Sequence, residues 1–434
     1  MLPLKRIKLI HILIKIVNIV DVMKIVVEPR IKKNIYVYYV SLVLLTVAIS
    51  LPHSVLTVLL LSKEVTLPQI MIIQAGYSFA VFISEYPSGL ISDIYPKKLV
   101  FVYSKFFLLV MFFLVIYMNS FWMLFIAWFM YGISSALDTG TIDAEIINNL
   151  RLSEGYIDKF ISNANRLNFI SLLIGSSIGS FIYYKIGIRF YWVSILLTIT
   201  SIICVTFFYK GESITNTTIS LSEMLKKMII QTREGIKEIR GKESLKLMIT
   251  LTFVEQFFFQ AHFQLWQALF LSKGINEYNF YIFYIVFQIL SIFAYSIPVS
   301  KLSHKNLGKH FSILIILLIF SLSLLNTTNK VLFIFVYITY VFIFTVLDFI
   351  SKYIFAKNVS SERISSLTSL KSSCGRVGAL LSMAGCGIIL KLTSVSNAII
   401  INFAFAMVMT TLIAIKYLIN TKNKAHCIEN KASK

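Results

Sequence analysis

Two glutamates lie in apolar stretches that are long enough to cross a bilayer, and neither has a basic residue nearby in sequence. Glu85 lies in the stretch 68–92, and Glu255 lies in the stretch 246–271. An ionised side chain at bilayer depth costs about 2.5–3.5 kcal/mol, so its presence there indicates a function. An unpaired carboxyl group in apolar surroundings can take up and release a proton. We predict Glu255 first, and Glu85 second, as proton-coupling residues; a role in the loop after Ser88 is the alternative for Glu85.

Two aspartates in apolar stretches are each followed, one helix later, by an arginine. Asp138 precedes Arg166, and Asp348 precedes Arg376. The facing ends of the two helices are close in sequence, so each aspartate and its arginine are expected at similar depth. We interpret them as two structural salt bridges, because a neighbouring arginine stabilises the carboxylate and opposes its protonation. In the alternative interpretation, a proton competes with the arginine for the aspartate and so drives switching. Asp138 and Asp348 are then also proton-coupling candidates.

The stretch 246–271 also carries a stripe of amides at helical spacing. Its members recur at i, i+4, i+8 and i+11, with aromatic residues beside them: Gln256, Gln260, Gln264 and Gln267, flanked by Phe263 and Trp266 among others. Amides facing lipid would be too costly to desolvate, so this face must meet protein or a wet cavity. The aromatic neighbours favour a binding wall for a bulky, partly apolar ligand. Hydrogen bonding between packed helices is the alternative.

Two histidines could reach the same cavity. His53 follows Pro52 in the first apolar stretch, and His262 lies within the glutamine-bearing stretch. Both are cavity candidates, and a simple packing role is at least as good an interpretation of each.

The composition excludes most soluble classes. Of 434 residues, 57% are hydrophobic and only 14% are charged, with a mean hydropathy of +0.79, against about a quarter charged in typical globular domains. The net charge of +21 is the excess expected of loops beside an acidic lipid face, and we do not expect nucleic-acid binding. Four cysteines without paired spacing indicate neither disulfides nor zinc. We find no nucleotide, hydrolase or metalloprotease motif, and so expect no enzyme, metal or cofactor.

The elements that must position these residues are membrane-spanning helices, each of about 20 apolar residues. The sequence predicts twelve: 35–61, 68–92, 99–118, 121–146, 162–184, 188–209, 246–271, 278–299, 310–326, 330–355, 365–390 and 394–418. The predicted fold is an all-α polytopic membrane protein with two six-helix halves, 35–209 and 246–418. The polar stretch 210–245 would be a cytoplasmic linker between them, and 419–434 a cytoplasmic tail.

The basic residues predict the orientation. With the N-terminus inside, the inner segments hold 33 Lys and Arg and the outer connections hold six. Such a bias places both termini in the cytoplasm. We expect a multi-pass protein of a bacterial cytoplasmic membrane, because heavy use of Ile and Lys is typical of AT-rich genomes.

The segment 1–34 is basic and is treated separately. His11 and Lys15 interrupt its apolar stretch and no small-residue cleavage site follows, so we reject a signal peptide. Two interpretations stay open: a helix lying in the membrane interface, or translation that begins at Met23.

The two halves repeat at an offset of 210 residues. Leu61-Ser62-Lys63 matches Leu271-Ser272-Lys273, Asp138 matches Asp348, Arg166 matches Arg376, and Gly175 matches Gly385. Six helices repeated in parallel orientation are typical of transporters that alternate around a midplane site.

The loop after the second helix carries a signature. Residues 89–98 read Gly-Leu-Ile-Ser-Asp-Ile-Tyr-Pro-Lys-Lys, which resembles the loop G-x-x-x-D-[R/K]-x-G-[R/K]-[R/K] of the major facilitator superfamily. Gly89, Asp93, Lys97 and Lys98 match, whereas Ile94 and Pro96 depart from the pattern. The resemblance covers residues 35–418 and implies a 12-helix major facilitator fold.

The resemblance also implies roles for the matching residues. Gly89 would allow close approach of the eleventh helix, and Asp93 would interact with that helix's N-terminal end. Lys97 and Lys98 would meet Asp143 and Glu145, so that the loop gates the transporter. The alternative for the two lysines is that they only set the topology.

The expected function is secondary active transport by alternating access. We expect a monomeric drug/proton antiporter-like permease that exports a bulky amphipathic compound, a drug or a small hydrophobic peptide, with a proton (or sodium) as the coupling ion. The competing expectations are proton-coupled import of a small metabolite, and a membrane sensor or assembly partner that transports nothing.

Overall fold

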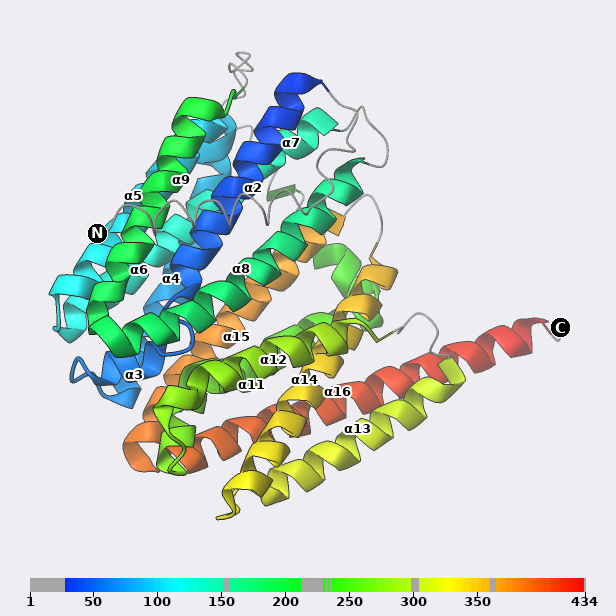
Figure 1. Cartoon of the computed structure of the whole chain (residues 1–434). Helices are drawn as coiled ribbons and strands as arrows, with labels where there is room; N and C mark the ends of the chain where they lie inside the picture. The colour runs from blue at the N-terminus through cyan, green and yellow to red at the C-terminus, as the bar shows by residue number, and fades with distance from the viewer. Residues whose placement is uncertain are drawn as a thin grey trace. The chain divides into compact units, whose positions relative to one another are not determined.

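The computed structural model describes residues 28–150, 156–211, 229–230, 233, 236–297, 304–359 and 364–432, and within these residues it is helical and contains no strand. Helices are the expected solution in a bilayer, because a helix satisfies its backbone hydrogen bonds internally. In chain order they are α2 (Pro29–Ser50), α3 (Leu56–Leu61), α4 (Leu67–Ile94), α5 (Lys97–Tyr117), α6 (Phe121–Asp138), α7 (Ile142–Leu150), α8 (Tyr156–Ile186), α9 (Tyr191–Phe208), α11 (Glu243–Ser272), α12 (Phe280–Tyr295), α13 (His304–Leu324), α14 (Lys330–Asn358), α15 (Ile364–Leu392) and α16 (Val395–Ala432) (Figure 1).

The helices follow the predicted spans. Each of the twelve predicted stretches coincides with one helix or with two consecutive helices. Among the described residues, nine helical stretches are long and apolar enough to cross a membrane, and one of them, Tyr156–Phe208, contains both α8 and α9. The apolar part of α13 is shorter, and α11 carries charged and amide side chains. These features indicate a multi-pass membrane protein.

Two predicted spans are interrupted. The first consists of α2 and α3, separated by a turn that contains Pro52, because proline has no backbone N–H and its ring disfavours a continuous helix. The fourth consists of α6 and α7, separated at Gly140, whose φ of +73° is readily adopted by glycine. Asp138 is therefore the last residue of a helix rather than an interior one.

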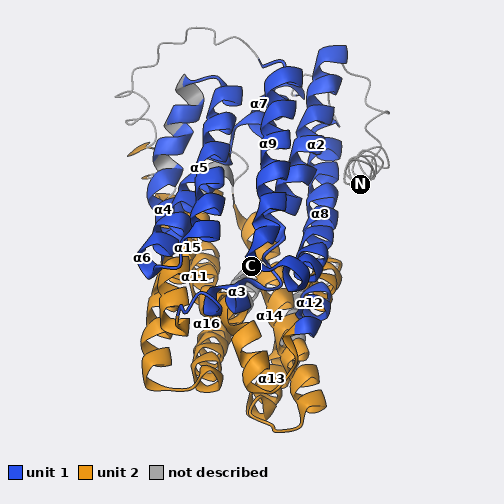
Figure 2. Ribbon diagram, turned by 60° about the vertical axis from the view of Figure 1, so that its left-hand side comes forward, with its two compact units in different colours: residues 1–65, 76–219, 278–285 blue, residues 66–75, 220–277, 286–434 orange. Residues whose placement is uncertain are grey.

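The described helices form two compact units (Figure 2). Unit 1 comprises residues 1–65, 76–219 and 278–285, and unit 2 comprises residues 66–75, 220–277 and 286–434. The boundary near residue 219 lies in the predicted linker. The first residues of α4 and of α12 belong to a different unit from the rest of their helix. The predicted halves, in contrast, contain each of these helices whole.

In unit 1, α2 is the central helix and packs against α8 and α9 (Figure 1). Gly175 and Gly179 of α8 make the closest approach. A Cβ atom added at either glycine would overlap Ser50 Oγ or the Leu51 carbonyl oxygen. Glycine is required there because any side chain would push α8 away from α2.

In unit 2, α11 has the corresponding place and packs against α15, α16 and α14. Here the close contact is made by Gly378, where an added Cβ would lie 2.5 Å from the Phe253 carbonyl oxygen. An added Cβ at Gly385 would meet no described atom within 4 Å. The match of Gly175 with Gly385 in sequence therefore does not extend to packing, and Gly378 makes the close contact in unit 2.

The repeated Leu-Ser-Lys motif makes the same kind of contact in both units. Lys63 Nζ donates to the Met118 carbonyl oxygen at 2.8 Å and to Asn119 Oδ1 at 2.8 Å. Lys273 Nζ donates to the Thr327 carbonyl oxygen at 3.1 Å. Each lysine thus binds carbonyl groups just beyond the end of a helix, where backbone acceptors lack partners within the helix.

Several predictions lie outside the described residues. They concern the segment 1–27, with His11, Lys15 and the possible start at Met23, and most of the linker 210–245. The side chain of Asp93 and the side chains of the tail from residue 421 onwards are also outside them.

Candidate functional site

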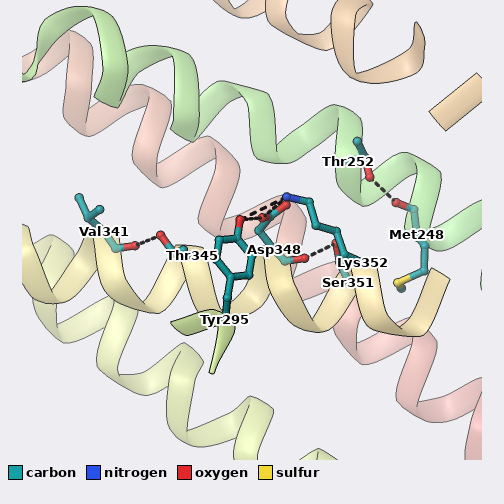
Figure 3. Close-up of polar contacts among 8 residues, drawn as sticks. All are labelled: Met248, Thr252, Tyr295, Val341, Thr345, Asp348, Ser351 and Lys352. Atoms are coloured by element: carbon teal, nitrogen blue, oxygen red, sulfur yellow. Dashed lines mark hydrogen bonds and ion pairs between the residues drawn. The ribbon is translucent and has the colours of Figure 1, made fainter. Parts of the chain in front are cut away.

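A buried carboxylate forms the centre of a polar network in unit 2. Asp348 lies on α14, and only 7% of the residue is exposed. Its Oδ2 accepts hydrogen bonds from Tyr295 of α12 at 3.0 Å and from Lys352 Nζ at 2.7 Å (Figure 3). Lys352 follows one helical turn after Asp348, the spacing at which side chains on a helix meet. The network is therefore built from one turn of α14 and the end of α12.

The predicted partner of Asp348 was wrong. The ion pair joins Asp348 to Lys352, and among the described residues none joins it to Arg376. Lys352 follows Asp348 by four residues, and this helical spacing was the signal in the sequence for their pairing. Tyr295 could not be found in this way, because its position depends on how α12 packs.

Among the described residues of this unit, Glu255 of α11 is the least solvated carboxylate. It is 1% exposed, and its Oε1 has no hydrogen-bond partner among the described residues. Asp348, Lys371 and Lys352 are the charged groups close enough to interact with it electrostatically. Lys371 of α15 is itself 9% exposed, with its ammonium group 4.6 Å from the centre of the Phe355 ring. The sequence analysis proposed Glu255 as a proton-coupling residue, and its neighbours Lys371 and Lys352 were not among the predicted site residues.

Unit 1 holds a different buried ion pair. Lys105 of α5 is 2% exposed and bonds Asp138 at 2.5 Å, whereas 41% of the Asp138 side chain is exposed. The ammonium group also lies 4.7 Å from the centre of the Phe101 ring. The predicted pairing of Asp138 with Arg166 was therefore wrong, and Arg166 is exposed. The position of Lys105 within a predicted span was a signal for it, since a lysine there needs a partner.

The glutamine stripe of α11 divides into an accessible and a buried part. Gln256, Gln260 and Gln264 are half-buried, and Gln260 donates to Gln256 at 3.1 Å. Gln267 is only 1% exposed. The stripe is therefore not a single accessible face.

The aromatic residues beside the stripe divide in the same way. Phe263 is 55% exposed, whereas Trp266 is 3% exposed and packs edge-on against Phe270 and Phe287. Gln267 and Trp266 are thus buried, whereas Phe263 is exposed beside the accessible glutamines. The predicted binding wall is thus shorter than the stripe.

The two histidines have packing contacts. His262 is buried, shares a hydrogen bond of 2.9 Å with the Tyr337 hydroxyl, and stacks on Phe258. The packing interpretation therefore holds for His262. His53 shares a hydrogen bond of 3.1 Å with the hydroxyl of Tyr284, which also belongs to unit 1.

The described residues contain no group of three or more His, Cys, Asp or Glu side chains that could hold a metal ion. The polar groups of both units are instead arranged as ion pairs and hydrogen bonds inside helical bundles. Such groups at bilayer depth are typical of transport pathways.

The sequence model of one family, described as "Major Facilitator Superfamily", matches residues 38–383. The chain belongs to the major facilitator superfamily. It is accordingly a transporter and not an enzyme. No curated protein sequence matches it.

Solved structures of major facilitators are similar in fold. The nucleoside transporter NupG has a TM-score of 0.68 at 14% identity, covering 90% of this chain and 99% of that one. A bacterial homologue of the human lysosomal transporter Spinster, inward-facing and unoccupied, has a TM-score of 0.64 at 10% identity, covering 91% and 98%. The POT family transporter PepTSo has a TM-score of 0.63 at 10% identity, covering 88% and 97%. At these identities the likeness concerns the fold alone.

The loop that carries the family signature makes other contacts than those implied by the resemblance. Lys98 Nζ donates to the carbonyl oxygens of Thr206 at 2.5 Å and Tyr209 at 3.1 Å, at the end of α9. Its implied pairing with Asp143 or Glu145 is corrected accordingly. Lys97 Nζ lies 3.4 Å from Ser92 Oγ.

The structure gives little support to the roles predicted for Gly89 and Glu85 in and before this loop. An added Cβ at Gly89 would meet no described atom within 4 Å, so the structure does not require glycine there. Glu85 is half-buried, and its backbone carbonyl oxygen accepts a hydrogen bond from Ser88 Oγ. Of the two glutamates predicted to carry a proton, Glu255 therefore has the better-defined surroundings.

Proposed function

We propose that this transporter is driven by protons and that Glu255 binds the coupling proton. The observation that supports this is the burial of Glu255 with an unbonded Oε1 beside the Asp348–Lys352 pair. Neutral Glu255 suits such an apolar site, since an ionised carboxylate left without a partner is costly there. When Glu255 ionises, a second negative charge appears near Asp348, and Lys371 and Lys352 are the cations close enough to respond. Protonation thus changes which partners the helices α11, α14 and α15 can hold.

We propose export of a bulky amphipathic compound as the transport reaction. The accessible part of α11, with Gln256, Gln260, Gln264 and the exposed ring of Phe263, offers amide hydrogen bonds beside an aromatic surface. Such a combination suits a ligand that is partly apolar and carries a few polar groups. The protein would act as a monomer in the cytoplasmic membrane, with both termini inside, as the bias of basic residues indicates.

The coupling is tested in proteoliposomes with Glu255→Gln. A lipophilic fluorescent substrate is first identified from a panel by its lower, protonophore-sensitive accumulation in expressing cells. The variant is expected to lose transport driven by an imposed pH gradient. It should keep exchange of labelled for unlabelled substrate, because exchange moves no net proton. Glu255→Asp, which retains a titratable group, is the matched control and should keep part of the driven transport.

Three results would contradict the proposal. Driven transport that survives in Glu255→Gln would exclude Glu255 as the proton-binding group. Concentrative uptake of a metabolite, with unchanged drug accumulation, would replace export by import. Binding of a compound without any ion-driven flux would indicate a sensor.

A further inference from the structure

Unit 1 contains an open pocket at one end of its helical bundle. It lies where α2 and α5 begin and α9 ends, and its volume is about 740 Å³. Its lining is basic and aromatic: Arg30, Pro96, Lys98, Phe207, Tyr209, Lys210 and Gly211. Three of these seven residues are cations, contributed by three segments that are far apart in the sequence.

The chain that forms one side of the pocket is held in place by side chains of α2. Asn34, only 2% exposed, donates to the Lys210 carbonyl oxygen at 2.9 Å and accepts from the Lys210 N–H at 3.0 Å. Arg30 Nη2 donates to the Gly211 carbonyl oxygen at 2.8 Å and to that of Lys210 at 3.3 Å. Lys98 fixes the preceding turn through its bonds to Thr206 and Tyr209. The backbone that carries Lys210 is thus fixed by a buried amide and two cations.

The pocket retains donors for an anion. A guanidinium group has five N–H donors and an ammonium group has three, and the described contacts of Arg30 and Lys98 use only part of them. The Lys210 side chain is exposed. Among the described residues, the carboxylate of Glu145 faces this region, and its Oε1 lies 3.5 Å from the position of an added Cβ at Gly211. The lining that the structure describes thus carries three cations and no carboxylate of its own.

Exposed aromatic rings lie beside these cations at the end of a membrane-spanning helix. Phe207 is 75% exposed and Phe208 is 52% exposed, and the ammonium group of Lys33 lies 5.8 Å from the centre of the Phe208 ring. Apolar rings next to cations at a helix end suit a molecule with a phosphate and an acyl chain. Basic pockets of this kind between transmembrane helices bind lipid head groups.

We propose that this pocket binds the phosphate head group of an anionic phospholipid. The phosphate would meet Arg30, Lys98 and Lys210, and an acyl chain would lie against Phe207 and Phe208. The site is independent of the proposed proton coupling, because it lies in unit 1 and shares no residue with the network around Asp348. A free phosphate offers the same oxygens, so the experiment must separate a lipid from a soluble anion.

The test is native mass spectrometry of the detergent-purified protein with added lipid. Phosphatidylglycerol should be retained at one copy per protein, whereas phosphatidylcholine, whose phosphate is paired with a cationic choline, should be lost. Lys210→Gln should weaken retention of phosphatidylglycerol by about fivefold, the effect of removing one basic contact to an anionic lipid. Lys357→Gln removes an exposed charge at the end of α14, outside the pocket, and should change nothing.

Three outcomes would overturn the proposal. Equal retention of the two lipids would show that the pocket does not select for negative charge. An equal effect of Lys357→Gln would show that net charge, and not this pocket, controls binding. Complete displacement of phosphatidylglycerol by millimolar inorganic phosphate would assign the pocket to a soluble anion. A preserved unfolding midpoint in Lys210→Gln would show that a weaker interaction is not due to misfolding.

Discussion

At the scale of single residues, the two ion pairs differ in which member is buried. In unit 1 the buried member is the cation, since Lys105 is 2% exposed and its partner Asp138 is 41% exposed. In unit 2 the buried member is the anion, since the side chain of Asp348 is 10% exposed and that of Lys352 is 53% exposed. A charge is tolerated at such depth only with a partner in reach. The halves thus hold their pairs in different surroundings, despite the matching positions of the two aspartates.

Removal of the exposed member of a pair should leave the buried charge without compensation. Asp138→Asn is expected to destabilise unit 1 by about 1–3 kcal/mol, less than a fully buried pair because water partly screens Asp138. The unfolding midpoint in detergent measures this cost. Adding Lys105→Met to the variant should recover most of the loss. If the double variant is as unstable as the sum of the two single variants, the pair is not the cause.

At the scale of helices, glycine positions determine how closely two helices pack. Gly175 and Gly179 bring α8 against α2, and Gly378 brings α15 against α11. The obstacle at Gly378 is the backbone carbonyl of Phe253, which cannot rotate away as a side chain can. The repeat at an offset of 210 residues matches Gly175 with Gly385, whereas the close contact of α15 is made at Gly378.

The two glycines of α15 provide a matched comparison. Gly378→Ala is expected to cost about 1–3 kcal/mol, because the added methyl group must push α15 from α11. Gly385→Ala, with open space around the added atom, should be neutral or stabilising by up to about 1 kcal/mol through helix propensity. Thermal unfolding of the two purified variants measures both effects. Equal midpoints would contradict the packing role assigned to Gly378.

At the scale of the whole molecule, the orientation proposed from the basic residues has a direct test. Exposed lysines are available on both sides: Lys185 follows a span whose end we place outside, and Lys357 ends a helix whose end we place inside. Among the described cysteines, Cys204 and Cys374 are half-buried and Cys386 is buried. A background in which Cys427 is replaced by serine should therefore react weakly.

In that background, Lys185→Cys is expected to react with a membrane-impermeant thiol reagent in intact cells. Lys357→Cys should react only after the membrane is made permeable. The pattern follows from the concentration of basic residues in the loops assigned to the inside. The reverse pattern would invert the topology, and the Cys427→Ser background measures unspecific labelling.

The membrane class, the helices and the family were determined by the sequence alone, because their causes are local. A stretch of about 20 apolar residues must become a helix in lipid, where no water can satisfy the backbone. The family signature at 89–98 and the repeat of Lys63 at Lys273 were likewise recognised from short stretches of sequence. Glu255 could be proposed from the sequence because a carboxyl group without a basic neighbour is unusual in an apolar stretch.

The tertiary structure decided which groups meet. Tyr295 reaches Asp348 because α12 ends beside α14. The pocket brings Arg30, Lys98 and Lys210 together because α2 and α5 begin where α9 ends. The stripe on α11 divides because tertiary packing buries Gln267 and Trp266 and leaves the other glutamines accessible. Helical spacing gives the face of one helix, but partner choice depends on the rotation and packing of its neighbours. The rotation and packing of each helix depend in turn on its contacts with all the helices around it, which no single stretch of sequence determines.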